Sequence, residues 1–212
     1  MKFLRYMLAV VVMSLSAMAV AQSDTHAHKA ADNPAPKSDA QRSVAPQSDA
    51  QRSFETLKNL AGTWTAKLTL DPPLPDMDDK LPSQISMRVT SRGNALVHEM
   101  YAVGVPDDPT RYDRPVTMFY LDADRLTLVH YCDAGNRPRM VARTSADGKT
   151  VEFDFVDISG GTQRGHMHHA VFTVIDANHH TEDWTYMMPG DKPMRAHFDL
   201  QRIKSGSGAS GK

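Results

Sequence analysis

The residues of this chain best suited to chemistry lie in the segment from Leu126 to Met140, L-T-L-V-H-Y-C-D-A-G-N-R-P-R-M. Leu126 and Leu128 occupy one face of a predicted half-buried β-strand, because side chains alternate between the two faces of a strand. His130 and Cys132 continue that face, where a plain core would have two more aliphatic residues. A titratable imidazole and the only thiol of the chain therefore share one face, just before a Gly-Asn turn.

A second group of candidate ligands lies at His166 and His168, which are two residues apart on a predicted strand and so point the same way. Together they could bind one transition metal ion or a haem, and a metal centre needs a third ligand. Alternatively, the imidazoles hydrogen-bond to one another and to nearby backbone inside a polar lumen. The third ligand could come from His98, His130, Cys132 or Glu182, and the set His130, His166 and His168 is the metal-binding alternative.

The turn after Cys132 adds polar and soft apolar groups. Asn136 and Arg139 could hold an anionic or amide group at the mouth of a barrel, although Asn136 is equally suited to stabilising the turn. Met140 suits an adaptable apolar pocket and also ordinary packing. Cys132 is either a small buried hydrophobe or a deliberately placed thiol. The predicted ligand-binding residues are His98, His130, Cys132, Asn136, Arg139, Met140, His166, His168, Glu182 and Trp184; no catalytic residue is assigned.

Period-2 alternation predicts about ten short strands to carry these residues, joined mostly by tight turns. We therefore expect an all-β antiparallel up-and-down barrel, since closure removes exposed edges. Ser53 is the expected N-cap of a short helix that closes the barrel. Residues 177–179 are predicted to form a three-residue loop that pairs Asp176 with His180 and places Phe172 opposite Trp184.

The two ends of the chain differ from this pattern. Residues 1–21 combine a positive start, an apolar run and an A-x-A site before Gln22, which predicts a secretory signal peptide with no stable membrane anchor after cleavage. Residues 22–53 are rich in Ala, Ser, Asp and Gln, include the repeated S-D-A-Q-R-S, and are predicted to be a disordered linker. The barrel is expected over residues 54–204 and a flexible Gly/Ser tail over 205–212. The protein should be periplasmic or extracellular.

Composition excludes some partners. The 24 Lys and Arg residues nearly balance 25 Asp and Glu residues, giving a formal net charge of −1, and the basic residues form no stripe. This argues against nucleic acid and anionic membranes as partners. One cysteine cannot form an internal disulfide, so stability must come from the core.

Gly62-Thr63-Trp64 at the start of the first strand resembles the Gly-x-Trp signature of lipocalin-like (calycin-type) barrels. The resemblance implies that Arg202 packs over the Trp64 ring as a structural pair. The run H-Y-C-D-A-G-N-R-P-R-M, with H-M-H-H and I-D-A-N-H-H-T-E-D-W-T, resembles an exported bacterial lipocalin-like family of unknown function. Nitrobindin-like haem barrels are similar in architecture only, because their haem-ligand motif has no match here.

Three functions are compatible with these features. The first is an exported barrel that binds a small, partly apolar molecule in a His-lined lumen, and it needs only a pocket and this fold. The second is a metal- or haem-dependent enzyme with His130 as acid or base, and the third is an envelope interaction protein. Strand parity predicts one shared interior for His130, Cys132, His166, His168, Glu182 and Trp184.

Overall fold

The computed structural model of the chain describes residues 46–73, 82–108, 110–144 and 147–204. The predicted signal peptide, the linker up to residue 45 and the predicted tail over 205–212 lie outside these described residues. Within the described part, no helix is long and apolar enough to cross a membrane.

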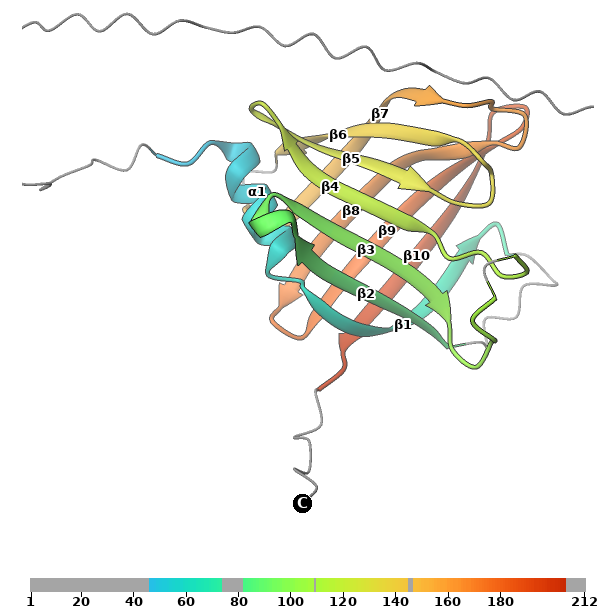
Figure 1. Ribbon diagram of the computed structural model, residues 1–212, viewed down its shortest axis with the longest axis horizontal. Coiled ribbons are helices and arrows are strands. Elements are labelled where there is room, and N and C mark those ends of the chain that lie inside the picture. The colour runs from blue at the N-terminus through green and yellow to red at the C-terminus, as the bar shows by residue number, and fades with distance from the viewer. Residues whose placement is uncertain (1–45, 74–81, 109, 145–146, 205–212) are drawn as a thin grey trace, which may run out of the picture. The chain divides into compact units, whose positions relative to one another are not determined.

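Ten antiparallel strands form a closed barrel, with each strand hydrogen-bonded to its neighbours in the chain and the last strand to the first (Figure 1). The prediction of an all-β up-and-down barrel with one short helix is confirmed. The strands are β1 (Gly62–Asp71), β2 (Ser83–Thr90), β3 (Ala95–Ala102), β4 (Val116–Asp122), β5 (Arg125–Tyr131), β6 (Arg137–Thr144), β7 (Thr150–Ser159), β8 (His166–Asp176), β9 (His179–Met188) and β10 (Lys192–Arg202); a short 3-10 turn, η1 (Ser91–Gly93), joins β2 to β3.

The helix α1 (Asp49–Lys58) begins earlier than the sequence predicts. Its N-cap is Ser48, whose side chain accepts a hydrogen bond from the Gln51 backbone, while the Gln51 side chain accepts one from the Ser48 backbone. This reciprocal capping box satisfies two backbone N–H groups that the first turn leaves free. The predicted N-cap at Ser53 and the predicted linker boundary at residue 53 are therefore wrong, and the second copy of the S-D-A-Q-R-S repeat starts the folded part.

The helix covers one end of the barrel, which we call the closed end (Figure 1). Its apolar face enters the core, where Phe54 and Leu57 are buried. Polar side chains tie the helix to loops at that end: Thr56 Oγ1 donates to the Gly148 carbonyl at 3.3 Å, and Lys58 Nζ donates to the Gly93 carbonyl at 3.4 Å. In an up-and-down barrel alternate connections share an end, so the β3–β4, β5–β6, β7–β8 and β9–β10 loops form the opposite end, here called the open end.

A tryptophan and an arginine join the first strand, the last strand and the helix. Trp64 is fully buried, and its indole Nε1 donates to the Leu60 carbonyl at 2.9 Å. The Arg202 guanidinium lies 4.1 Å from the centroid of the Trp64 ring, in the arrangement that the Gly-x-Trp resemblance implies. Gly62 has a φ of 143°, and a Cβ at this position would collide with the Arg202 guanidinium, so glycine is required there.

The β8–β9 hairpin is tighter than predicted. Asp176 pairs with His179, which leaves a two-residue loop, and a register shift near Val174 brings Val174 opposite His180. Phe172 consequently faces Glu182, and Ala170 faces Trp184. The predicted partner of Asp176 was wrong by one residue, and beyond the register shift the predicted partner of Phe172 was wrong by two. Because the shift of the Phe172 partner is an even number of residues, it changed the paired residues but left the inward face of β9 as predicted.

Candidate functional site

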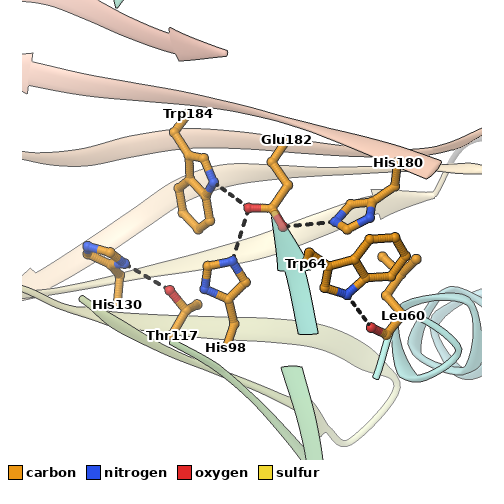
Figure 2. Close-up of polar contacts among 8 residues, drawn as sticks. All are labelled: Leu60, Trp64, His98, Thr117, His130, His180, Glu182 and Trp184. Carbon is orange, nitrogen blue, oxygen red and sulfur yellow. Dashed lines mark hydrogen bonds and ion pairs between the residues drawn. The ribbon is translucent and has the colours of Figure 1, made fainter. Parts of the chain in front are cut away.

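The interior of the barrel holds a carboxylate, Glu182, that has no exposed surface. Its Oε2 accepts hydrogen bonds from Trp184 Nε1 and lies 3.0 Å from His98 Nε2, while its Oε1 lies 3.1 Å from His180 Nε2 (Figure 2). Burial alone would raise the pKa of Glu182, but the two histidines outweigh it through their charge and hydrogen bonds and hold this pKa well below its usual range. Glu182 is therefore an ionised group with a donor on each side.

Alternation on β9 explains how these groups meet. His180, Glu182 and Trp184 stand at every second position, and all three are buried. Their burial shows that they point inward, since the positions between them on β9 are exposed or half-buried. His98 comes from β3 on another part of the wall, so the Glu182 network crosses the barrel from one wall to the other (Figure 2).

A second polar pair extends the network toward the open end. Thr117 on β4 pairs in register with His98 on β3 and with His130 on β5, so these three residues form one row across neighbouring strands. Thr117 Oγ1 and His130 Nδ1 are 2.9 Å apart. Burial, with a smaller contribution from the charge of His98, lowers the pKa of His130 to about 3. His130 is thus a neutral imidazole at physiological pH.

Aromatic rings surround this polar row. His98 contacts Phe119, Phe172 and Trp184 at centroid distances of 6.4, 6.3 and 6.0 Å, and His130 contacts Trp184 at 5.6 Å. Phe119 and Phe172 have no exposed surface. At the level of His98 the lumen is therefore filled by side chains. Three imidazole nitrogens in it have no hydrogen-bond partner among the described residues: His98 Nδ1, His130 Nε2 and His180 Nδ1.

A cavity of about 440 Å³ lies at the open end, between the β3–β4 loop and the end of β5. Two tyrosines contribute aromatic rings to its lining, and two arginines contribute positive charge. The Cys132 thiol lies between Tyr131 and Asp133 along the chain. We call this cavity the mouth pocket; it is lined by Thr110, Arg111, Tyr112, Asp113, Arg114, Tyr131, Cys132 and Asp133.

Titratable groups in the mouth pocket are shifted toward their neutral forms. Burial raises the pKa of the half-buried Cys132 thiol, and the nearby charges of Asp113 and Asp133 add to this effect. Burial also raises the pKa of Asp113, with a further contribution from the charge of Asp133. A raised pKa keeps Cys132 protonated, so it is a weak nucleophile. The ligand atoms of these three residues lie within 4.8 Å of one another, which is the spacing of a metal site, but two of the three side chains are exposed.

His166 and His168 lie apart from His130. His166 Nε2 and His168 Nδ1 are 3.2 Å apart, and both rings pack on Phe155 at centroid distances of 4.8 and 5.1 Å. Both histidines are half-buried, whereas His130 is 3% exposed. Among the described residues, two groups of three side chains have metal-ligand spacing, and neither contains any of these histidines. The predicted shared interior therefore holds His130, Glu182 and Trp184, but the histidine pair and Cys132 lie outside it.

A β-bulge accounts for this separation. On β8 Met167 faces Tyr186 and His169 faces Thr185, so His168 is an extra residue with no partner on β9. One extra residue reverses the face of everything before it. Met167 accordingly packs against the core, on the face where strict alternation predicts His166 and His168.

The remaining predicted site residues have separate contacts. Asn136 is buried, and its Nδ2 donates to the Gly161 and Gly165 carbonyls at 2.9 and 2.7 Å, which ties the β5–β6 loop to the β7–β8 loop. Arg139 pairs with Asp157 on β7, with Nε 3.0 Å from Oδ1. Met140 is fully buried in the core.

The other group with metal-ligand spacing comprises Glu152, Asp154 and His169 on β7 and β8. Arg143 on β6 already pairs with both carboxylates, and His169 Nε2 lies 2.9 Å from Glu152 Oε1. The group is a half-exposed cross-strand ion network, in which the arginine supplies the positive charge that a metal ion would bring.

Two members of the interior network were missed by sequence reasoning, His180 and Thr117. The signal for His180 is the H-T-E-D-W spacing, which places three polar or aromatic residues at every second position of one strand. Thr117 has no such signal, because it reads as an ordinary strand residue and gains its role only from its neighbours on β3 and β5.

No family model matches the chain, and no curated protein matches it. Among solved structures, Rv2717c from M. tuberculosis is similar with a TM-score of 0.51 and 12% sequence identity, over 72% of this chain and 98% of that chain. A protein of unknown function from the DUF3598 family of Nostoc punctiforme has a TM-score of 0.44 and 8% identity, over 69% of this chain and 49% of that chain. At this level of identity, the similarity to Rv2717c concerns the barrel fold alone.

Proposed function

We propose that this protein is an exported lipocalin-like barrel that binds a small, partly apolar molecule at its open end. The observation that carries the proposal is the mouth pocket, whose volume of about 440 Å³ falls in the range of small-molecule sites. The Gly62, Trp64 and Arg202 arrangement at the closed end supports the lipocalin-like assignment. Export rests on the leader-like residues 1–21, and the mature chain is then expected to begin at Gln22.

The lining of the mouth pocket suggests what such a molecule looks like. Tyr112 and Tyr131 offer aromatic surface, and Arg111 and Arg114 lie on the loop beside them. Arg114 already pairs with Asp107, with Nη1 3.0 Å from Oδ1, and the Arg111 guanidinium lies 5.8 Å from the Tyr112 ring. An aromatic molecule with a polar or anionic edge matches this lining.

Anilinonaphthalenesulfonate, a fluorescent aromatic anion, is a suitable probe of the mouth pocket. We expect one molecule to bind per mature chain with a rise in fluorescence, and to slow the labelling of Cys132 by a maleimide. Tyr131→Ala should weaken binding about three- to tenfold, the loss expected for one aromatic contact. Tyr120→Ala provides the matched control, because Tyr120 is a half-buried tyrosine of the neighbouring strand that does not line the pocket.

Equal binding by the wild type and Tyr131→Ala, together with unchanged labelling of Cys132, would place the probe elsewhere and count against the mouth pocket. Circular dichroism in the near ultraviolet, recorded on each variant, separates a lost contact from a loosened barrel, which also binds this probe.

A further inference from the structure

The buried polar atoms near the open end that have no hydrogen-bond partner among the described residues include His130 Nε2 and Asn136 Oδ1. Their side chains are 3% and 1% exposed. A buried polar group without a partner costs on the order of 1–3 kcal/mol, so each such atom calls for a ligand or an ordered water. Both residues were singled out by the sequence, and the mouth pocket does not include either of them.

His130 lies near the end of β5, and Asn136 lies in the β5–β6 loop directly before β6, so both residues are near the open end. Val129 pairs with Arg139 in the β5–β6 ladder, His130 directly follows Val129, and Asn136 is three residues before Arg139. His130 continues the buried face of β5, and Asn136 precedes the buried Met140 by an even number of residues. Continuing this register past the start of β6 places Asn136 on the same side as His130 and diagonal to it.

The direction of each free atom is fixed by the bonds that the same side chain makes elsewhere. Asn136 Nδ2 donates hydrogen bonds to the carbonyls of Gly161 and Gly165, so Oδ1 remains, and it can only accept. His130 uses Nδ1 in its contact with Thr117. Figure 2 shows its other ring nitrogen on the side away from Trp64 and α1, that is, toward the open end.

We propose that His130 and Asn136 form an inner subsite, reached from the mouth pocket past Cys132, that binds an uncharged group carrying an O–H or N–H bond. The proposal rests on the proposed function and names the chemical class of its ligand. Cys132 lies two residues after His130, directly after the end of β5, and lines the mouth pocket, so it lies between the two places along the chain. Trp184, whose ring is 5.6 Å from that of His130, provides an apolar wall.

The chemistry of the two atoms selects the ligand group. Asn136 Oδ1 can only accept, so the ligand must donate a hydrogen. His130 Nε2 can donate or accept, because the Thr117 hydroxyl can either donate to Nδ1 or accept from it and thus permits both tautomers. The imidazole is neutral, so a buried anion would meet no positive charge on either residue of the subsite. Alcohols, phenols and primary amides satisfy these conditions, whereas ethers and carboxylates do not.

Two matched pairs of small probes test the subsite in the unmodified mature chain: phenol against anisole, and benzamide against benzoate. We expect phenol and benzamide to bind about tenfold more tightly than their partners, the difference expected for loss of a buried hydrogen bond. Nitrogen-15 NMR of the imidazoles should show a shift at His130 Nε2 on addition of phenol and a smaller one on addition of anisole. The paired probes require no substitution, so the result does not depend on the folding of a variant.

His130→Phe keeps an aromatic ring and removes the nitrogen, and it should reduce the preference for phenol over anisole, because only Asn136 Oδ1 then remains to bind the hydroxyl. The matched control is His169→Phe, at a half-buried position bonded to Glu152, which should keep the preference. If each pair binds equally, or if His130→Phe keeps the full preference, the subsite is overturned and the two atoms hold water only. Binding of anilinonaphthalenesulfonate at the mouth pocket would survive that outcome, whereas its failure would overturn the proposed function itself.

Discussion

At the scale of single residues, His130 shows how the interior sets the charge of a side chain. It is almost fully buried beside Trp184, and its one hydrogen bond goes to an uncharged hydroxyl. Glu182, by contrast, is surrounded by three donors and stays ionised. The partners that surround these two side chains therefore keep one of them neutral and the other negatively charged within the same lumen.

The low pKa of His130 predicts a loss of stability in acid. The unfolded chain binds a proton at this imidazole below about pH 6.5, whereas the folded chain resists it down to about pH 3. The contribution is therefore complete above pH 6.5 and decreases as the pH falls from 6.5 to 3, by up to about 1.4 kcal/mol per pH unit. Denaturant unfolding at several pH values measures it, and His130→Gln should flatten this part of the profile.

An NMR titration of the folded protein provides a direct check. The His130 imidazole should stay neutral at pH 5, and a midpoint near 6.5 would show that burial does not depress its pKa.

At the scale of elements, α1 depends on its first turn. The helix has ten residues and would be marginal in isolation, so its cap and its packing both contribute to closing the barrel. Ser48 and Gln51 provide the capping box, and Phe54 and Leu57 provide the packing.

Ser48→Ala should destabilise the protein by about 0.5–2 kcal/mol, the usual cost of removing an N-cap hydroxyl. Ser53→Ala is the matched control: Ser53 lies inside the helix, where alanine has the higher helix propensity, so this change should have little effect. Thermal or denaturant unfolding of the two variants compares them. A larger loss for Ser53→Ala would mean that the helix begins where the sequence alone had placed it.

The elements also show which parts of the fold were predictable. Alternation revealed the ten strands, because each has one face in the core and the side chains repeat every two residues. The helix start was missed because S-D-A-Q-R-S has the composition of a linker in both copies and acts as a cap in only one. The site was partly predictable: Glu182 and Trp184 followed from parity, but the bulge at His168 has no local sequence signal and reversed the face of His166.

At the scale of the whole molecule, the contacts of Arg202 join the elements that meet where the barrel closes. Arg202 donates to the carbonyls of Asn59, Ala61 and Ala177 at 3.1, 2.6 and 2.8 Å while covering the Trp64 ring. The helix C-terminus, the first strand, the β8–β9 loop and the last strand thus meet at a single side chain.

Trp64→Ala should cost about 3–5 kcal/mol of unfolding free energy, because it leaves a cavity in the core and removes the ring under the guanidinium. Arg195→Met is the matched control in the same strand pair: it removes an exposed ion pair with Asp71, for which about 0–1 kcal/mol is expected. Calorimetry of the two variants decides the matter. An unchanged melting temperature for Trp64→Ala would contradict the role given to this residue.

The pairing of β1 with β10 has a consequence for how the chain is made. Its partners include Trp64 and Arg202, so the strands that close the circle are the first and the last to be synthesised. Until β10 has been translated, β1 and β9 each present an unpaired edge, and such edges invite pairing with other chains. A nascent or truncated chain that lacks β10 therefore cannot complete its fold, and its two open edges remain available to other chains until the last strand is released.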